Sequence, residues 1–221
     1  MPPILIVLII MAVLALGAVA WRQEVKRRQA VRAWVLRRHW HLAPDKRRGW
    51  DREYPGIKLF GRGHSRSGRG VIKGAWHERP VTLLDYTYVT GSGKNRQTHK
   101  YGVVILHCDF PTIPLQLRRE NPLDKIGEFV GLDDIDFESA EFSRKFYVKS
   151  SDRKWAYDVI HPRTMEFLLQ SPSFELEFGM AELAVYKRGW FAPDAYEQAL
   201  DLAWGIYDRI PDYVVRSMKG S

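Results

Sequence analysis

The sequence predicts an α+β protein in which a single N-terminal transmembrane helix is followed by an antiparallel-sheet domain with packed helices. Three observations support this fold class. An uncharged apolar run opens the chain at residues 4–21, strand-like alternation begins at residue 71, and segments with helix-capping residues follow the strands. Of the 221 residues 45% are hydrophobic, which excludes a disordered chain, and the single Cys excludes a disulfide scaffold within one chain.

The apolar run of residues 4–21 reads ILIVLIIMAVLALGAVAW. As a helix it would span roughly 27 Å, close to the ~30 Å hydrocarbon core of a bilayer. Trp21 stands at its end, where an interfacial aromatic anchor is expected. We therefore predict that residues 1–21 form a transmembrane anchor.

A cleaved signal peptide is the alternative interpretation, because Ala18-Val19-Ala20 is similar to a cleavage site. However, no Lys or Arg precedes the apolar run, and a basic cluster follows it directly, which opposes translocation of the rest of the chain. We expect an uncleaved single-pass anchor in the cell membrane, with the N-terminus outside and the C-terminal domain cytoplasmic. The lone Cys108 fits a reducing compartment.

The net charge of +8 is unevenly distributed, since residues 21–73 carry +12 and residues 74–221 carry −4. We predict that residues 22–48 form a basic juxtamembrane helix that contacts the anionic leaflet, each cation contributing about 1 kcal/mol. The predicted membrane-surface residues are Arg22, Lys26, Arg27, Arg28, Arg32, Arg37 and Arg38. The alternative is that they act only as topology signals. Nucleic acid is not expected as a partner, because the anionic membrane would repel it.

Residues 49–70, which include GRGHSRSGRG, are expected to form a Gly/Arg-rich linker, and residues 71–221 a cytoplasmic α+β domain. Alternation predicts strands at 71–77, 81–89, 98–108, 115–118 and 146–149, and a closing hairpin at 174–178 and 183–187. Helices are predicted at 123–130, 153–160, 162–170 and 195–210. Short turns between the first strands predict an antiparallel meander.

The sequence contains no Ser/His/Asp elbow, CxxC pair or HExxH motif. The candidate metal ligands are Asp133, Asp134, Asp136 and Glu138, because hard cations such as Ca²⁺ or Mg²⁺ take clustered oxygen ligands. This run lacks the spacing of an EF-hand, so a solvated acidic loop, or one that docks on nearby basic pairs, is the alternative. No cofactor is expected.

Residues 131–157 resemble a stretch in uncharacterised bacterial membrane-anchored proteins with a cytoplasmic α+β domain. The matching positions are Asp136-Phe137-Glu138, Phe142, Phe146, Val148, Asp152 and Ala156, and the resemblance extends from Gly74 onwards. It implies an architecture and a location but no known activity. Packing explains the same pattern, with the aromatic residues in the core and Asp152 as a helix cap.

Two functions are consistent with these features. The first is a membrane-anchored protein whose cytoplasmic domain is non-catalytic and binds a protein partner or a lipid headgroup of the anionic leaflet. The second is an enzyme that acts on a membrane-associated or cell-envelope substrate, with a divalent cation at the acidic run 133–138.

Overall fold

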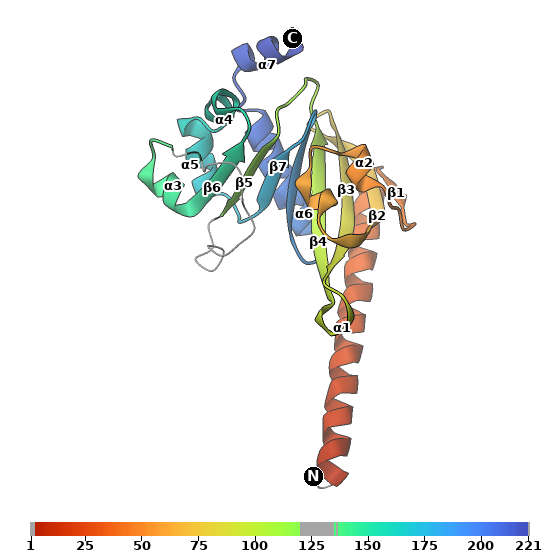
Figure 1. Ribbon diagram of the computed structural model, residues 1–221. Helices are drawn as coiled ribbons and strands as arrows, with labels where there is room; N and C mark the ends of the chain where they lie inside the picture. Colours follow the sequence, from red (N-terminus) through yellow and green to blue (C-terminus); the bar gives the residue numbers. More distant parts are fainter. Residues whose placement is uncertain (1–2, 120–134, 136, 221) are drawn as a thin grey trace.

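The computed structural model describes residues 3–119, 135 and 137–220. An eight-stranded sheet with the order β1-β2-β3-β4-β8-β7-β5-β6 forms its centre, and every strand pair is antiparallel (Figure 1). The strands are β1 His41–Ala43, β2 His64–Trp76, β3 Arg79–Thr90, β4 Gln97–His107, β5 Leu115–Arg119, β6 Phe146–Ser150, β7 Glu175–Phe178 and β8 Glu182–Arg188. Packed helices and a long apolar N-terminal helix complete the predicted α+β fold, which is confirmed.

The helices that accompany the sheet are short, apart from the first and the sixth. They are α1 Pro3–Arg37, α2 Trp50–Glu53, α3 Ala140–Lys145, α4 Arg153–Val159, α5 Pro162–Gln170, α6 Pro193–Tyr207 and α7 Asp212–Lys219, with 3₁₀ turns η1 Lys58–Gly61 and η2 Gly93–Asn95. The helix predicted at 123–130 lies outside the described residues.

Helix α1 leaves the domain as a long rod, and its N-terminal end lies far from the sheet (Figure 1). Side chains from residue 8 to residue 23 are exposed, among them Leu16 at 70% and Trp21 at 69%. By length and composition, α1 is the one helix in the described part of the chain that could cross a membrane. Transfer of such an apolar surface from water into the hydrocarbon core of a bilayer is favourable.

The basic helix ends earlier than the predicted residue 48. His39 takes a left-handed conformation with φ 54°, and its backbone N–H donates to the Leu36 carbonyl at 3.1 Å. The N–H of Trp40 donates to the Val35 carbonyl, also at 3.1 Å, which completes a Schellman ending. The chain then turns back and pairs as β1 with β2, so residues 38–48 are not helical.

Residues 49–70 are not the expected linker, because they form α2, η1 and the first half of β2. Trp50 is 1% exposed and Phe60 is fully buried, so this segment covers one face of the sheet. Gly68 belongs to the same packing, since a Cβ there would overlap the Trp50 ring. Burial of these aromatic side chains outweighs the loop tendency of the surrounding glycines.

The predicted meander holds for β2, β3 and β4, but β5 does not follow it. The hairpin of β7 and β8 inserts between β4 and β5, and β8 pairs with β4 from Gly102↔Lys187 to His107↔Glu182. Residues Leu183 to Tyr186 are all buried, which is the pattern of a central strand covered on both faces.

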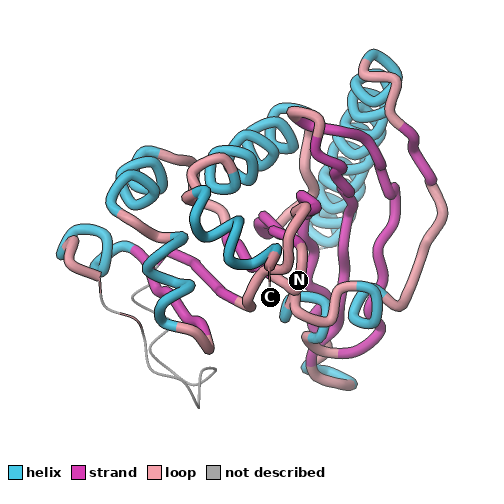
Figure 2. The backbone as a smooth tube through the Cα atoms, turned by 90° about the horizontal axis from the view of Figure 1, so that it is seen from above, coloured by secondary structure: helices cyan, strands magenta, loops and turns pink. Residues whose placement is uncertain are grey.

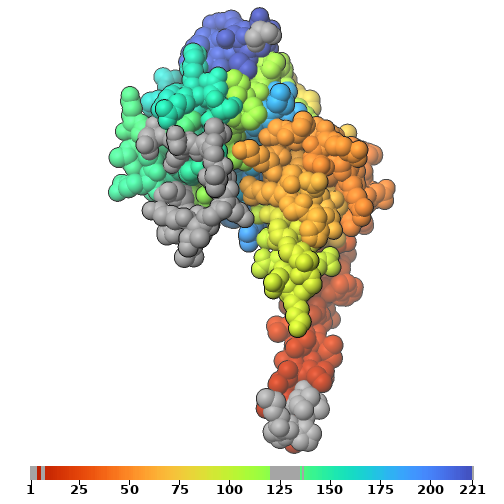
Figure 3. Space-filling model, viewed as in Figure 1, coloured from red at the N-terminus to blue at the C-terminus, as the bar shows by residue number. Residues whose placement is uncertain are grey.

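Each face of the sheet carries its own layer (Figure 2). On one face, α6 and the end of α1 pack against β3, β4 and β8 in the larger apolar core. On the other face, α2 and η1 cover the same strands with a second, aromatic-rich core. The β3–β4 hairpin extends beyond both layers, in the direction in which α1 leaves the domain (Figures 1 and 3).

Candidate functional site

The seven basic residues predicted to bind the membrane surface occupy two different environments. Arg22, Lys26, Arg28, Arg32 and Arg37 are exposed, whereas Arg27 and Arg38 are partly buried. These two arginines face the sheet and α6, and they join α1 to the domain.

Arg27 forms a polar junction between α1 and the sheet. Its Nη2 donates to Asp85 Oδ2 at 2.6 Å, its Nη1 to the Phe191 carbonyl at 2.8 Å, and its Nε to Glu24 Oε2 at 2.9 Å. The side chains of Arg27 and Asp85 are only 14% and 9% exposed. Burial raises the pKa of Asp85, and the Arg27 guanidinium opposes that rise. The pair is thus a buried charge pair that orients α1, rather than a free cation.

Trp34 and Arg38 form a second junction about two to three turns beyond Arg27, where α1 ends. Trp34 Nε1 donates to Glu197 Oε1 at 2.7 Å, and Arg38 Nη2 donates to the same oxygen at 2.6 Å. The Arg38 guanidinium also lies 4.6 Å from the centre of the Trp76 ring. The hydrogen bond from Trp34, followed by that from Arg38, lowers the pKa of Glu197. Together with buried Val31 and Val35, this junction fixes the end of α1 on α6.

A cavity of about 100 Å³ lies between α1 and β2, next to the Arg27–Asp85 pair. Arg28 and Arg32 line it from α1, and Arg69 lines it from β2. Val31 and Leu42 form part of its apolar wall. A register irregularity between Arg69 and Ile72 interrupts the alternation of β2 and leaves Arg69 beside α1.

Sequence reasoning missed a buried carboxylate on the opposite face of the sheet. Glu177, only 1% exposed, accepts hydrogen bonds from Tyr186 Oη at 2.6 Å, from Gln116 Nε2 at 2.9 Å and from the Leu59 backbone N–H at 3.2 Å. Gln116 and Glu177 are directly opposite in the ladder. The alternation of residues 115–119 and 175–178 was the available signal. The network joins η1 to β5 and β7, which is a structural role.

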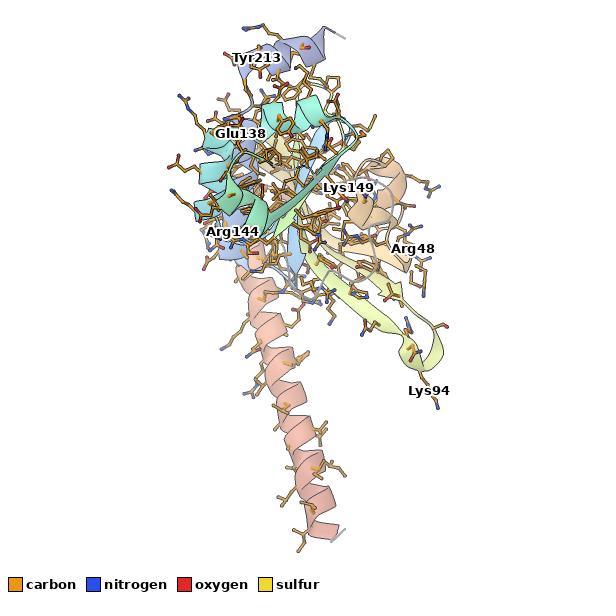
Figure 4. The ribbon with its side chains drawn as sticks, turned by 60° about the vertical axis from the view of Figure 1, so that its left-hand side comes forward. Arg48, Lys94, Glu138, Arg144, Lys149 and Tyr213 are labelled. Atoms are coloured by element: carbon orange, nitrogen blue, oxygen red, sulfur yellow. The ribbon has the colours of Figure 1, made fainter. Side chains whose placement is uncertain are left out.

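The predicted metal ligands are not assembled within the described residues. Asp133, Asp134 and Asp136 lie outside them, and Glu138 is exposed on the surface (Figure 4). Among the residues that the structure describes, no group of three or more His, Cys, Asp or Glu side chains could hold a metal ion. Burial raises the pKa of the Cys108 thiol to about 12, so this thiol is a poor nucleophile at neutral pH.

The residues that carry the family resemblance are structural where they are described. Phe142, Phe146, Val148 and Ala156 are buried in the larger core. Asp152 caps α4, because its Oδ1 accepts a hydrogen bond from the Trp155 backbone N–H at 2.9 Å.

The sequence matches no model of a known protein family, and it matches no curated protein. The fold is similar to the crystal structure of the mycobacterial trehalose monomycolate transport factor A, TtfA, with a TM-score of 0.60 and 10% sequence identity. The similarity covers 83% of this chain and 95% of that one. The two chains therefore share a fold.

Proposed function

We propose that the chain is a single-pass membrane protein, with its N-terminus outside and its domain in the cytoplasm, and that this domain acts by binding rather than by catalysis. The apolar, exposed first part of α1 supports the anchor. The basic cluster that follows residue 21 supports the orientation, because cytoplasmic flanks are enriched in Lys and Arg.

The continuity of α1 is the observation that carries this proposal. One helix of 35 residues runs from the apolar segment into the core of the domain without a break. Its last two turns bury Val31, Trp34 and Val35, and its two polar junctions bind Asp85 and Glu197. Because α1 is packed into the core of the domain, the domain has a fixed orientation relative to the bilayer. A fixed orientation favours binding to a partner in the same membrane.

Distance along α1 separates the basic residues that would contact the leaflet from those that would not. Lys26 lies about 8 Å from Trp21 along the helix axis, whereas Arg37 lies about 24 Å away. The Debye length at physiological ionic strength is about 8 Å. Arg22 and Lys26 therefore remain our proposed contacts with the anionic leaflet, and Arg37 contributes little.

The shared fold suggests what kind of process the domain serves. TtfA is named as a transport factor for trehalose monomycolate, a lipid. By analogy, we propose that the present chain is an accessory factor for the transport or handling of an envelope lipid, and that its domain docks on a membrane-protein partner. The rigid mounting of the domain supports this analogy, since a docking surface gains affinity from preorganisation.

Site-specific labelling tests the proposed topology. We expect a Lys94→Cys variant to react with a membrane-impermeant maleimide in inverted membrane vesicles and not in intact cells. Wild-type protein is the matched control, because its half-buried Cys108 has a raised pKa and should react slowly in both preparations. Labelling of Lys94→Cys in intact cells would overturn the cytoplasmic location.

A further inference from the structure

The cavity between α1 and β2 has an unbalanced charge. Arg27 is paired with Asp85, and Glu24 is shared among Arg27, Arg28 and Arg69 at 2.9, 2.7 and 3.9 Å. Arg32 has no ion pair within the described part of the chain. Four guanidinium groups therefore meet two carboxylates, which leaves a surplus of two positive charges around the cavity.

The positions of the arginines add to the repulsion between their positive charges. Arg28 and Arg32 are four residues apart on one face of α1, so their like charges repel each other. Arg69 approaches from β2, with its side chain 41% exposed and its guanidinium 4.8 Å from the centre of the Trp190 ring. Three arginines from two elements thus line one cavity, and an anion bound between their guanidinium groups would reduce the repulsion.

The cavity also has an apolar side, formed by Val31, Leu42 and Pro44. Its volume of about 100 Å³ is several times what a single water needs. A small inorganic anion would leave this apolar wall without a contact. A ligand with a charged group at one end and carbon atoms at the other would use both parts of the cavity.

We propose that this cavity binds a phosphate ester, with the phosphate among Arg28, Arg32 and Arg69 and the ester carbons against the apolar wall. A phosphate dianion matches the surplus of two charges, and guanidinium groups bind phosphate oxygens bidentately. Arg28 lies about 10 Å from Trp21 along α1, and Arg32 about 16 Å. That height is accessible both to a headgroup raised from the leaflet and to a soluble phosphate ester.

Calorimetric titration of the full chain in a zwitterionic detergent, at 150 mM NaCl, tests the site. The two probes are glycerol 3-phosphate, which is soluble, and dihexanoyl phosphatidic acid, which is a lipid. We expect wild-type protein to bind at least one of them. Tighter binding of the lipid identifies a lipid source, and equal or tighter binding of glycerol 3-phosphate identifies a soluble one.

Variants assign the binding to the cavity. We expect Arg32→Gln with Arg69→Gln to weaken binding about tenfold or more, since each lost charge-assisted hydrogen bond accounts for about one decade. Arg32→Glu is a second variant, which reverses the charge at this position. Arg32 is exposed and has no ion pair within the described residues, so the substitution should not affect folding. Arg144→Gln with Arg153→Gln is the control. It removes two exposed arginines from α3 and α4, which contact β6 at the opposite edge of the sheet from β1 and β2.

Two results would overturn the proposal: no heat from either probe at millimolar concentration, or an equal loss of affinity in the control variant. The lipid source rests on the proposed cytoplasmic, membrane-anchored function, but the binding measurement does not. Labelling from outside the cell would refute the topology and leave the phosphate site standing, whereas a failed titration would refute only the site.

Discussion

Arg27 and Arg28 are adjacent in the sequence and identical in chemistry, yet they have different roles. Arg27 is turned towards the sheet and holds Asp85, while Arg28 is half-exposed and makes an i,i+4 contact with Glu24. A buried charge pair broken on one side leaves an uncompensated charge, whereas an exposed pair contributes little. Position on the helix, and not residue type, decides which arginine is structural.

We therefore expect Arg27→Ala to lower the free energy of unfolding by about 3 kcal/mol, because Asp85 would stay buried without its counter-ion. The matched Arg28→Ala should lower it by less than about 0.5 kcal/mol. Urea unfolding of the full chain in zwitterionic micelles measures both values. Equal losses in the two variants would contradict the assignment of Arg27 as the structural residue.

At the scale of elements, the contact between α1 and α6 depends on Glu197. Its ionised carboxylate accepts hydrogen bonds from Trp34 and Arg38, and its pKa is lowered in the folded protein. A lowered carboxyl pKa contributes stability that is fully present above the usual value of 4.5. This contribution decreases as the pH falls through the lowered pKa of the folded state.

We expect Glu197→Gln to flatten the acid side of the stability profile, from pH 4.5 downwards. The difference should be at most about 1 kcal/mol, because the Glu197 side chain is 39% exposed and solvent screens the interaction. Denaturant unfolding at a series of pH values gives the profile. Glu166→Gln, at an exposed position on α5, is the control for the loss of one carboxylate elsewhere on the surface.

At the scale of the whole molecule, the β3–β4 hairpin and α1 extend in the same direction. Asp85 is level with Arg27, and the strand from Asp85 to Thr90 covers about 17 Å. The helix from Arg27 back to Trp21 covers only about 9 Å. Even if the strand is inclined to α1, the hairpin tip reaches the level of Trp21, where the apolar surface ends.

Lys94 stands at that tip, and Tyr213 stands at the opposite end of the domain (Figure 4). With the chain in a bilayer, we expect a nitroxide at Lys94→Cys to be relaxed by lipids that carry a Ni²⁺-chelating headgroup. A nitroxide at Tyr213→Cys should be unaffected. A Cys108→Ser background removes the native thiol. Equal relaxation at the two sites would show that the hairpin does not face the leaflet.

Local pattern was enough to predict several parts of this molecule. The apolar run of residues 4–21, the meander of β2 to β4 and the final long helix α6 all follow from periodicity over neighbouring residues. The seven basic residues were also recognised as a group. Their division into structural and exposed members could not be predicted, because the partners Asp85 and Glu197 are more than 50 residues away in the sequence.

The sequence by itself determined the anchor-like helix, the charge of the segment after it and the α+β class, since each depends on composition or on short-range spacing. The tertiary structure alone decided that residues 49–70 belong to the core, that β7 and β8 separate β4 from β5, and that Arg28, Arg32 and Arg69 surround one cavity. These features depend on contacts between distant segments, where burial of aromatic side chains such as Trp50 outweighs the local preference of glycine-rich stretches for loops.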